Sequence, residues 1–268
     1  MINYELLLFI FVHLTDNSFT IFNIKGQSKS YLTGSLITCI IKSKGYNFLT
    51  GHINGKINEW SINFKREEGT NYINLNDVII GNKREYIAHK NSVNLIHYSI
   101  LLDLIISSGD DKIYIRKYYD LSLLSVINIE NTICIELKIS LCYLYILFYD
   151  EIRKSYIIKV YSVNGILVAQ SDYGLINNID CDKEGNILVG YFQDYKIDIY
   201  NPSIQKKIYE LRIDNSQIDT KDDISNSKQI PIFQSFYYNP INNSVYCSFS
   251  NGSLIKKFIE FYNKEKEK

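Results

Sequence analysis

Short runs of alternating apolar and polar residues fill most of the chain, and one frame of such runs recurs along it. Each copy starts at a short polar turn, which holds Asp or Asn in nearly every copy. The third residue after the turn position is large and apolar, and strict alternation follows. The copies cover residues 16–22, 54–60, 110–116, 155–161, 194–200 and 251–257. The recurrence predicts a series of similar β-meanders.

The spacing of the copies indicates the size of each meander. Their period of about 40 to 45 residues suits four short strands per unit, as in a blade of a β-propeller. Two intervals are longer because the stretches near 65–83 and 214–228 are polar and poor in strand pattern. We expect loop insertions between blades there. Since one twisted sheet cannot bury both of its faces alone, neighbouring blades must stack around an axis.

Two kinds of position define the repeated frame. The turn positions are Asp16, Asn54, Asp110, Asp194 and Asn251, and the aromatic closing positions include Trp60, Tyr161 and Tyr200. Asp and Asn at a turn accept hydrogen bonds from nearby backbone amides, which favours a structural role for the turn residues. The pair Asp110 and Asp111 could also be a paired-carboxylate site, which is the less favoured interpretation.

Composition supports a β-rich chain. The 268 residues include 45 Ile, 23 Tyr and 13 Phe but only 2 Ala. The formal net charge is zero, which argues against a nucleic-acid coat protein or a polybasic membrane binder. The five cysteines are scattered without a C-x-x-C pair and indicate core thiols in a reducing, cytoplasmic compartment. The apolar run 6–12 is too short for a membrane span and predicts a buried strand.

One part of the chain resembles a WD-repeat blade. Ala88-His89 precedes Ser107-Ser108-Gly109-Asp110. In the WD repeat a Gly-His-like pair starts the blade, an Asp occupies the turn between the second and third strands, and a Trp closes the third. The resemblance implies that His89 is a structural blade residue whose ring hydrogen-bonds the turn carboxylate. Trp60 is the only Trp, and the closing position otherwise holds Phe22, Arg116, Tyr161 and Tyr200.

The order of several short segments resembles the C-terminal propeller of BEACH-domain proteins, the neurobeachin-like family. The segments are 13–19, 102–109, 160–169, 251–255 and 258–261, of which the phrase Y-S-x-N-G-x-L-x-A at 161–169 is the most specific. The resemblance implies the tail of a large cytosolic scaffold in vesicle and lysosome-related trafficking, peripheral on endomembranes through upstream domains. No BEACH segment precedes the propeller, and only one strand, within 4–15, precedes the first turn where two are expected. We therefore expect a gene-model fragment or a C-terminal piece of a longer chain.

Motifs for chemistry are missing from the sequence. It contains no G-x-S-x-G, P-loop, G-x-G-x-x-G or H-E-x-x-H signature. His13, His52, His89 and His97 share no metal-ligand spacing with a cysteine, so we expect neither a metal nor a cofactor. The stretch 214–227 is acidic and rich in hydroxyls. It is either a phosphorylatable docking loop or a plain insertion.

These observations predict an all-β, WD-repeat-like β-propeller of six to seven blades, with incomplete terminal blades, in one domain over 1–268. The function we expect is a non-enzymatic scaffold that binds other proteins through its rims, without nucleic acid and without membrane insertion. Its first version is the BEACH-type trafficking scaffold. A generic WD-repeat adaptor of another multiprotein complex is the alternative, and a propeller enzyme with its site at the channel mouth is a less favoured one.

Overall fold

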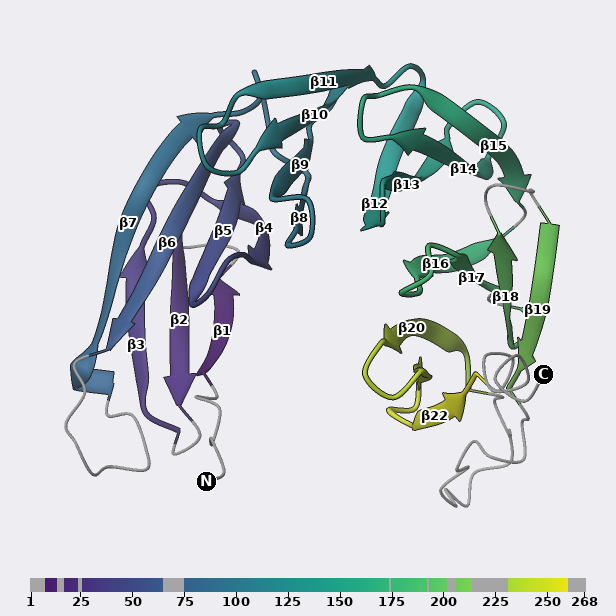
Figure 1. The fold of residues 1–268 in the computed structure, drawn as a ribbon. Helices are drawn as coiled ribbons and strands as arrows, with labels where there is room; N and C mark the ends of the chain where they lie inside the picture. Colours follow the sequence, from purple (N-terminus) through teal and green to yellow (C-terminus); the bar gives the residue numbers. More distant parts are fainter. Residues whose placement is uncertain are drawn as a thin grey trace. The chain divides into compact units, whose positions relative to one another are not determined.

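The fold consists of antiparallel sheets built from consecutive strands. The computed structural model describes residues 8–13, 17–23, 26–64, 75–173, 175–191, 193–201, 206–213 and 231–259. Six sheets occur within this part of the chain, and we number them 1 to 6 in chain order. Figure 1 shows that each sheet is a meander whose neighbouring strands also follow one another in sequence.

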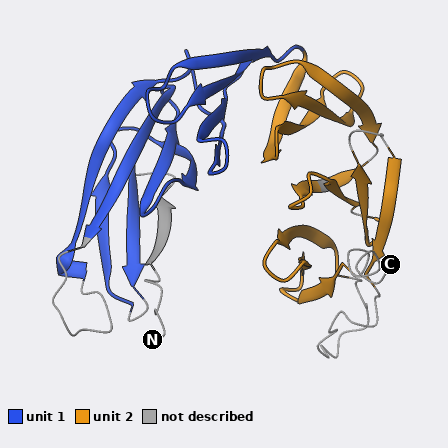
Figure 2. Ribbon diagram, in the orientation of Figure 1, with its two compact units in different colours: residues 1–130 blue, residues 131–268 orange. Residues whose placement is uncertain are grey.

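The first compact unit, residues 1–130, holds sheets 1 to 3 (Figure 2). Sheet 1 has three strands, β1 (Leu8–His13), β2 (Ser18–Asn23) and β3 (Ser28–Leu32). Sheet 2 has four, β4 (Ile37–Lys42), β5 (Asn47–His52), β6 (Lys56–Phe64) and β7 (Val78–Ile87), with the short 3-10 helix η1 (Leu75–Asp77) before β7. Sheet 3 has four, β8 (Leu95–Ser99), β9 (Leu104–Ser108), β10 (Lys112–Lys117) and β11 (Leu123–Asn128).

The second compact unit, residues 131–268, holds sheets 4 to 6. Sheet 4 has four strands, β12 (Thr132–Ser140), β13 (Tyr143–Asp150), β14 (Ser155–Ser162) and β15 (Leu167–Tyr173). Sheet 5 has four, β16 (Ile176–Cys181), β17 (Ile187–Tyr191), β18 (Lys196–Asn201) and β19 (Lys206–Arg212). Sheet 6 has three described strands, β20 (Phe233–Asn239), β21 (Ser244–Phe249) and β22 (Leu254–Phe258).

The frame found in the sequence marks the same kind of strand in every sheet. Its copies coincide with β2, β6, β10, β14, β18 and β22, which follow the central turn of each meander. The strand before this turn is buried almost throughout, as in the all-buried β9 and in the run from Leu144 to Phe148 of β13. A strand with both faces covered reads as a continuous apolar run, whereas a frame strand such as β10 alternates between buried and partly exposed residues.

A β-bulge recurs directly before the closing position of sheets 2 to 5. In sheet 2, Glu59 pairs with Arg84 but Trp60 pairs with Asn82, so that Lys83 is the extra residue. An extra residue bends its strand and increases the local twist. Sheets 3, 4 and 5 have the extra residue at Leu124 before Arg116, at Val168 before Tyr161 and at Ile208 before Tyr200. The closing position is therefore a repeated structural position even where its residue is no longer aromatic.

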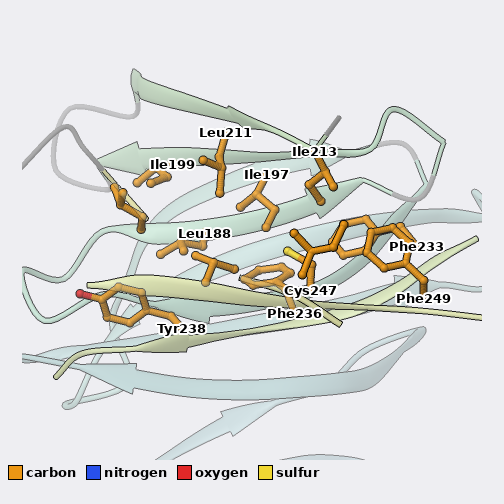
Figure 3. Close-up of a cluster of buried hydrophobic side chains, with 13 residues drawn as sticks. Leu188, Ile197, Ile199, Leu211, Ile213, Phe233, Phe236, Tyr238, Cys247 and Phe249 are labelled. Atoms are coloured by element: carbon orange, nitrogen blue, oxygen red, sulfur yellow. The ribbon is translucent and has the colours of Figure 1, made fainter. Parts of the chain in front are cut away.

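Apolar cores lie between consecutive sheets. Figure 3 shows the core between sheets 5 and 6, where Leu188 and Ile197 of sheet 5 face Phe236 and Cys247 of sheet 6. Phe19 of sheet 1 packs against Trp60 of sheet 2 in the same manner, with ring centroids 5.2 Å apart. Two further cores join sheets 2 and 3 and sheets 4 and 5. Each sheet thus covers a face of the next within its unit.

The predicted loop at 65–83 is wrong in its second part. Val78 to Lys83 belong to β7, whose pairing with β6 starts at Phe64 opposite Val78. The outer strand of a sheet faces solvent along one edge, so it tolerates the polar residues that suggested a loop. The predicted insertion at 214–228 lies outside the described residues. That residues 1–268 form one domain stays a prediction, since the chain divides into two units.

Candidate interaction surface

The turn residues predicted from the frame act on their own turns. The Asn54 side-chain oxygen accepts a hydrogen bond from the Lys56 backbone N–H at 3.2 Å, and Asn251 accepts one from Ser253 at 3.0 Å. Such Asx turns hold the tight connection before the frame strand. Asp194 lies in the corresponding turn of sheet 5, with its carboxylate 3.8 Å from the Lys196 ammonium. Asp16 lies outside the described residues.

His89 and Asp110 are close in the fold but do not form the expected hydrogen bond. The carboxylate of Asp110 instead accepts bonds from the side-chain amides of Asn91 and Asn94, at 3.1 and 3.2 Å. His89 Nε2 lies 2.9 Å from Ser107 Oγ, and His89 Nδ1 is buried without a partner. The two amides hold the exposed Asp110 carboxylate outside the sheet, which explains why the ring does not reach it.

The buried ring of His89 predicts a pH-dependent stability. Burial lowers the pKa of His89 to about 4, from an ordinary value of 6.5. The unfolded chain therefore binds the proton more readily between these values, and the stabilisation is present above pH 6.5 and lost as the pH falls toward 4. Between pH 7 and pH 5 we expect the native chain to lose about 2 kcal/mol more stability than the His89→Gln variant. Urea unfolding at both pH values measures this, and equal losses would contradict a buried neutral ring.

Trp60 starts a buried chain of polar side chains in sheet 2. Its Nε1–H donates to Thr50 Oγ1 at 2.9 Å, and the Thr50 hydroxyl lies 2.9 Å from His52 Nε2. His52 Nδ1 is 3.1 Å from the Ser35 carbonyl oxygen, so it carries the proton and Nε2 accepts. Burial lowers the pKa of His52 and favours this neutral form. From the sequence we considered His52 only as a possible metal ligand and missed this chain of hydrogen bonds.

The closing tyrosines have separate environments. Tyr161 is buried in sheet 4, and burial raises the pKa of its hydroxyl. The Tyr200 hydroxyl lies 3.2 Å from that of Tyr191 and donates to the Asp198 carboxylate at 3.3 Å. The described turn and closing residues of the frame therefore lie in different sheets and do not form one common site. Among the described residues, no group of His, Cys, Asp and Glu is arranged to hold a metal ion.

Charged side chains on the first strands of sheets 4 and 5 bond to the backbone of the next sheet. Glu136 Oε2 accepts from the Ile179 N–H and Asp180 Oδ2 from the Tyr238 N–H, both at 2.8 Å. Lys138 Nζ lies 3.3 Å from Glu136 and 3.6 Å from Asp180. Burial raises the pKa of Glu136, whereas for Lys138 the two carboxylates outweigh burial and raise its pKa. These contacts favour a structural role, in which the side chains join neighbouring sheets.

A buried carboxylate joins sheets 2 and 3. Glu59 on β6 is fully buried and accepts hydrogen bonds from Arg84 and from the Tyr118 hydroxyl, with Lys83 Nζ 3.1 Å away. Asn47 also donates to it, at 3.0 Å. Burial disfavours the carboxylate, but the hydrogen bonds from Tyr118 and Lys83 and the charge of Arg84 outweigh it, so the pKa of Glu59 lies below its ordinary value. The bulge at Lys83 brings both cations to this carboxylate.

Exposed apolar side chains cover the turns directly beside this cluster. Ile100 and Leu101 in the β8–β9 turn are 74% and 83% exposed, and Tyr119 after β10 is 66% exposed. Tyr46, in the β4–β5 turn, is 60% exposed. We call these four residues, together with Leu102, the turn patch. A group of large exposed apolar residues on neighbouring turns is typical of a protein-binding site.

Hydrogen bonds show that these turns are neighbours. The Tyr118 N–H donates to the Asp103 carbonyl at 2.8 Å, which joins the two turns of sheet 3. Arg84 of sheet 2 donates to the Tyr119 carbonyl at 3.2 Å, and Asn47 lies 3.5 Å from the Tyr118 hydroxyl. The Glu59 cluster therefore fixes the turns that carry the patch. The sequence held one signal for it, the apolar triplet 100–102 within a turn.

Comparisons with known proteins agree with the fold. A chain of a solved structure titled "Crystal Structure of Mitotic Checkpoint Complex" superposes with a TM-score of 0.63 over 94% of this chain and 72% of that one. The two sequences are 10% identical, so the likeness concerns the fold. This chain is an all-β propeller with a WD-repeat-like fold, which confirms the fold class predicted from the repeat.

The sequence comparisons found no relatives. No family model matches the chain, and no curated protein matches it. The BEACH-type resemblance therefore has no support from them. Among the described helices, none is long and apolar enough to cross a membrane.

Proposed function

We propose that this protein is a non-catalytic adaptor that binds other proteins through its turns. The observation that carries the proposal is the turn patch, whose large apolar side chains are exposed to solvent. The turns that carry them are held by the buried Glu59 cluster, in which Glu59 pairs with Arg84. A rigid scaffold with variable exposed turns is how many interaction domains present their binding residues. The similar chain comes from a structure of a complex, which agrees with protein partners without naming them.

From the sequence we expect a BEACH-type trafficking scaffold first and a generic adaptor as the alternative. The proposal corresponds to the alternative. The trafficking role, the attachment to endomembranes through upstream domains and the cytoplasmic location remain predictions without support from the comparisons. The charged groups of β12 and β16 are bonded to backbone amides, which favours a structural role over a catalytic one at these strands.

The turn patch is tested by a double substitution. We expect Ile100→Ser with Leu101→Ser to lose the partners that co-purify stoichiometrically with the native chain, because the apolar contact area is removed. Thermal unfolding should stay unchanged, since both side chains are exposed. Quantitative affinity purification from the source cells measures the loss.

Ile152→Ser is the matched control, because Ile152 is also an exposed turn isoleucine, 76% exposed, but lies in sheet 4. It should retain the partners. Retention by the double variant would contradict the patch. Turnover of a small substrate that depends on residues of one rim would contradict the adaptor function itself.

A further inference from the structure

Sheet 6 has an open edge at β22. Its pairing with β21 places Cys247 opposite Ile255 and Val245 opposite Lys257, and the Ile259 N–H continues this ladder to the Asn243 carbonyl. In an antiparallel ladder alternate residues bond to the partner strand, so the N–H and C=O groups of residues 254, 256 and 258 point the other way. No strand among the described residues pairs with that edge.

A groove runs along this open edge. Its volume is about 360 Å³, and it lies between residues 209–212 of β19 and residues 256–258 of β22. Both strands are the last described strands of their sheets, as Figure 1 shows for sheets 5 and 6. A strand added to β22 would enter this groove. An exposed row of backbone donors and acceptors is a ready template for such pairing.

The groove carries excess positive charge. The one carboxylate among its described lining residues, Glu210, is already paired with Lys207 at 2.8 Å and with Arg212 at 2.7 Å. Lys256 and Lys257 line the opposite wall. The Lys256 ammonium lies over the Phe258 ring, 4.6 Å from its centroid, and no carboxylate of the described residues pairs with it. The groove therefore favours an acidic occupant.

Apolar side chains flank the same edge. Leu254 and Phe258 alternate with Lys256 on one face of β22 and are 67% and 56% exposed. Ile255 and Ile259 point to the other face and pack in the core with sheet 5. An added strand that alternates acidic and apolar residues would place its acidic side chains on the face of Lys256 and its apolar side chains on the face of Ile255 and Ile259.

We propose that β22 accepts an extended, acidic segment of a partner protein as a fourth strand of sheet 6. The inference deepens the proposed adaptor function, since it adds a second surface and the chemistry of what binds there. Main-chain hydrogen bonds supply affinity in such an addition, and side chains supply specificity. A segment of this chain or a second copy are the other possible occupants, and the experiment separates them.

The test uses the full chain and a labelled synthetic peptide of alternating valine and glutamate. We expect binding by fluorescence anisotropy, and slower amide hydrogen exchange at residues 254, 256 and 258 in the complex. Lys256→Glu should weaken binding by about tenfold or more. Lys90→Glu, an exposed lysine in the loop before sheet 3, should leave it unchanged.

Several results would overturn the proposal. They are absence of binding, equal binding of a valine–lysine peptide, and binding without protection of the three amides. Protection of these amides in the free protein would also overturn the proposal. Protection that depends on protein concentration would mean that a second copy covers the edge. Protection independent of concentration would mean that a segment of the same chain covers it. The turn-patch variant has its own readout, so a failure at β22 leaves the adaptor proposal standing.

Discussion

Gly55→Ala should lower the free energy of unfolding by about 4 kcal/mol, through strain in the turn and overpacking. Gly55 has a φ of +79°, which L residues adopt only at a cost. An added Cβ would also lie less than 3.0 Å from the carbonyl oxygens of His89 and Asn91. Both are backbone atoms of the connection between sheets 2 and 3, so no side-chain rotation relieves the contact. Urea unfolding followed by circular dichroism measures the change.

Gly45→Ala is the matched control. Gly45 also has a positive φ, +64°, but an added Cβ would meet nothing within 4 Å, so only the backbone cost of about 1 kcal/mol applies. The difference between the two variants isolates the close approach of the connecting loop to the β5–β6 turn. Similar costs for both would show that this loop does not lie against Gly55.

The second large effect is expected for Glu59→Gln, which should destabilise the fold by about 3 kcal/mol. The substitution keeps the shape of the side chain but leaves Arg84, which is largely buried, without its counter-charge. Thermal and urea unfolding should both detect the loss. The pKa of Glu59 lies below its ordinary value of 4.5, so its stabilisation is present above that pH and is lost as the pH falls through the folded-state pKa.

Lys83→Ala serves as the control for Glu59. The Lys83 side chain is 48% exposed, and its loss should cost about 1 kcal/mol or less. The double variant Glu59→Gln with Arg84→Met should recover part of the stability, because it removes the unpaired cation as well. A Glu59→Gln variant as stable as the native chain would mean that Glu59 is not buried between sheets 2 and 3.

The sequence predicted the strands of the repeat because their pattern is local. Alternation after an Asn or Asp turn depends only on neighbouring residues, and each copy of the frame coincides with a strand. The outer strand β7 was missed because its middle, from Gly81 to Lys83, is polar on a solvent-facing edge. An edge strand needs no apolar alternation there, so its pairing with β6 left no periodic signal.

The candidate site was less predictable because it depends on contacts between sheets. The recurring bulge is a shift in the register between two paired strands, and no residue pattern in either strand predicts it. Glu59 reads in the sequence as an ordinary polar residue before Trp60, and only the packing of sheet 3 buries it beside Tyr118. Likewise, His52 gained its role from Thr50 and from the Ser35 carbonyl, a residue 17 positions earlier.

The fold of this protein does not by itself determine which partners it binds. The likeness to a solved propeller concerns the arrangement of strands, whereas the proposed binding of partners depends on exposed side chains such as Leu101 and Lys256. The turn patch is apolar and the β22 edge is basic, so the two surfaces suit different partner segments. An adaptor that joins two partners needs such a pair of surfaces.

The packing of one meander on the next is tested most directly by the contacts of Trp60. As the only Trp of the chain, it gives indole proton resonances that need no further assignment. We predict nuclear Overhauser effects from its ring protons to the rings of Phe19 in sheet 1 and Phe48 in sheet 2, at centroid distances of 5.2 and 6.3 Å. Effects to Phe48 without any to Phe19 would contradict face-to-face packing of sheets 1 and 2, and with it the propeller.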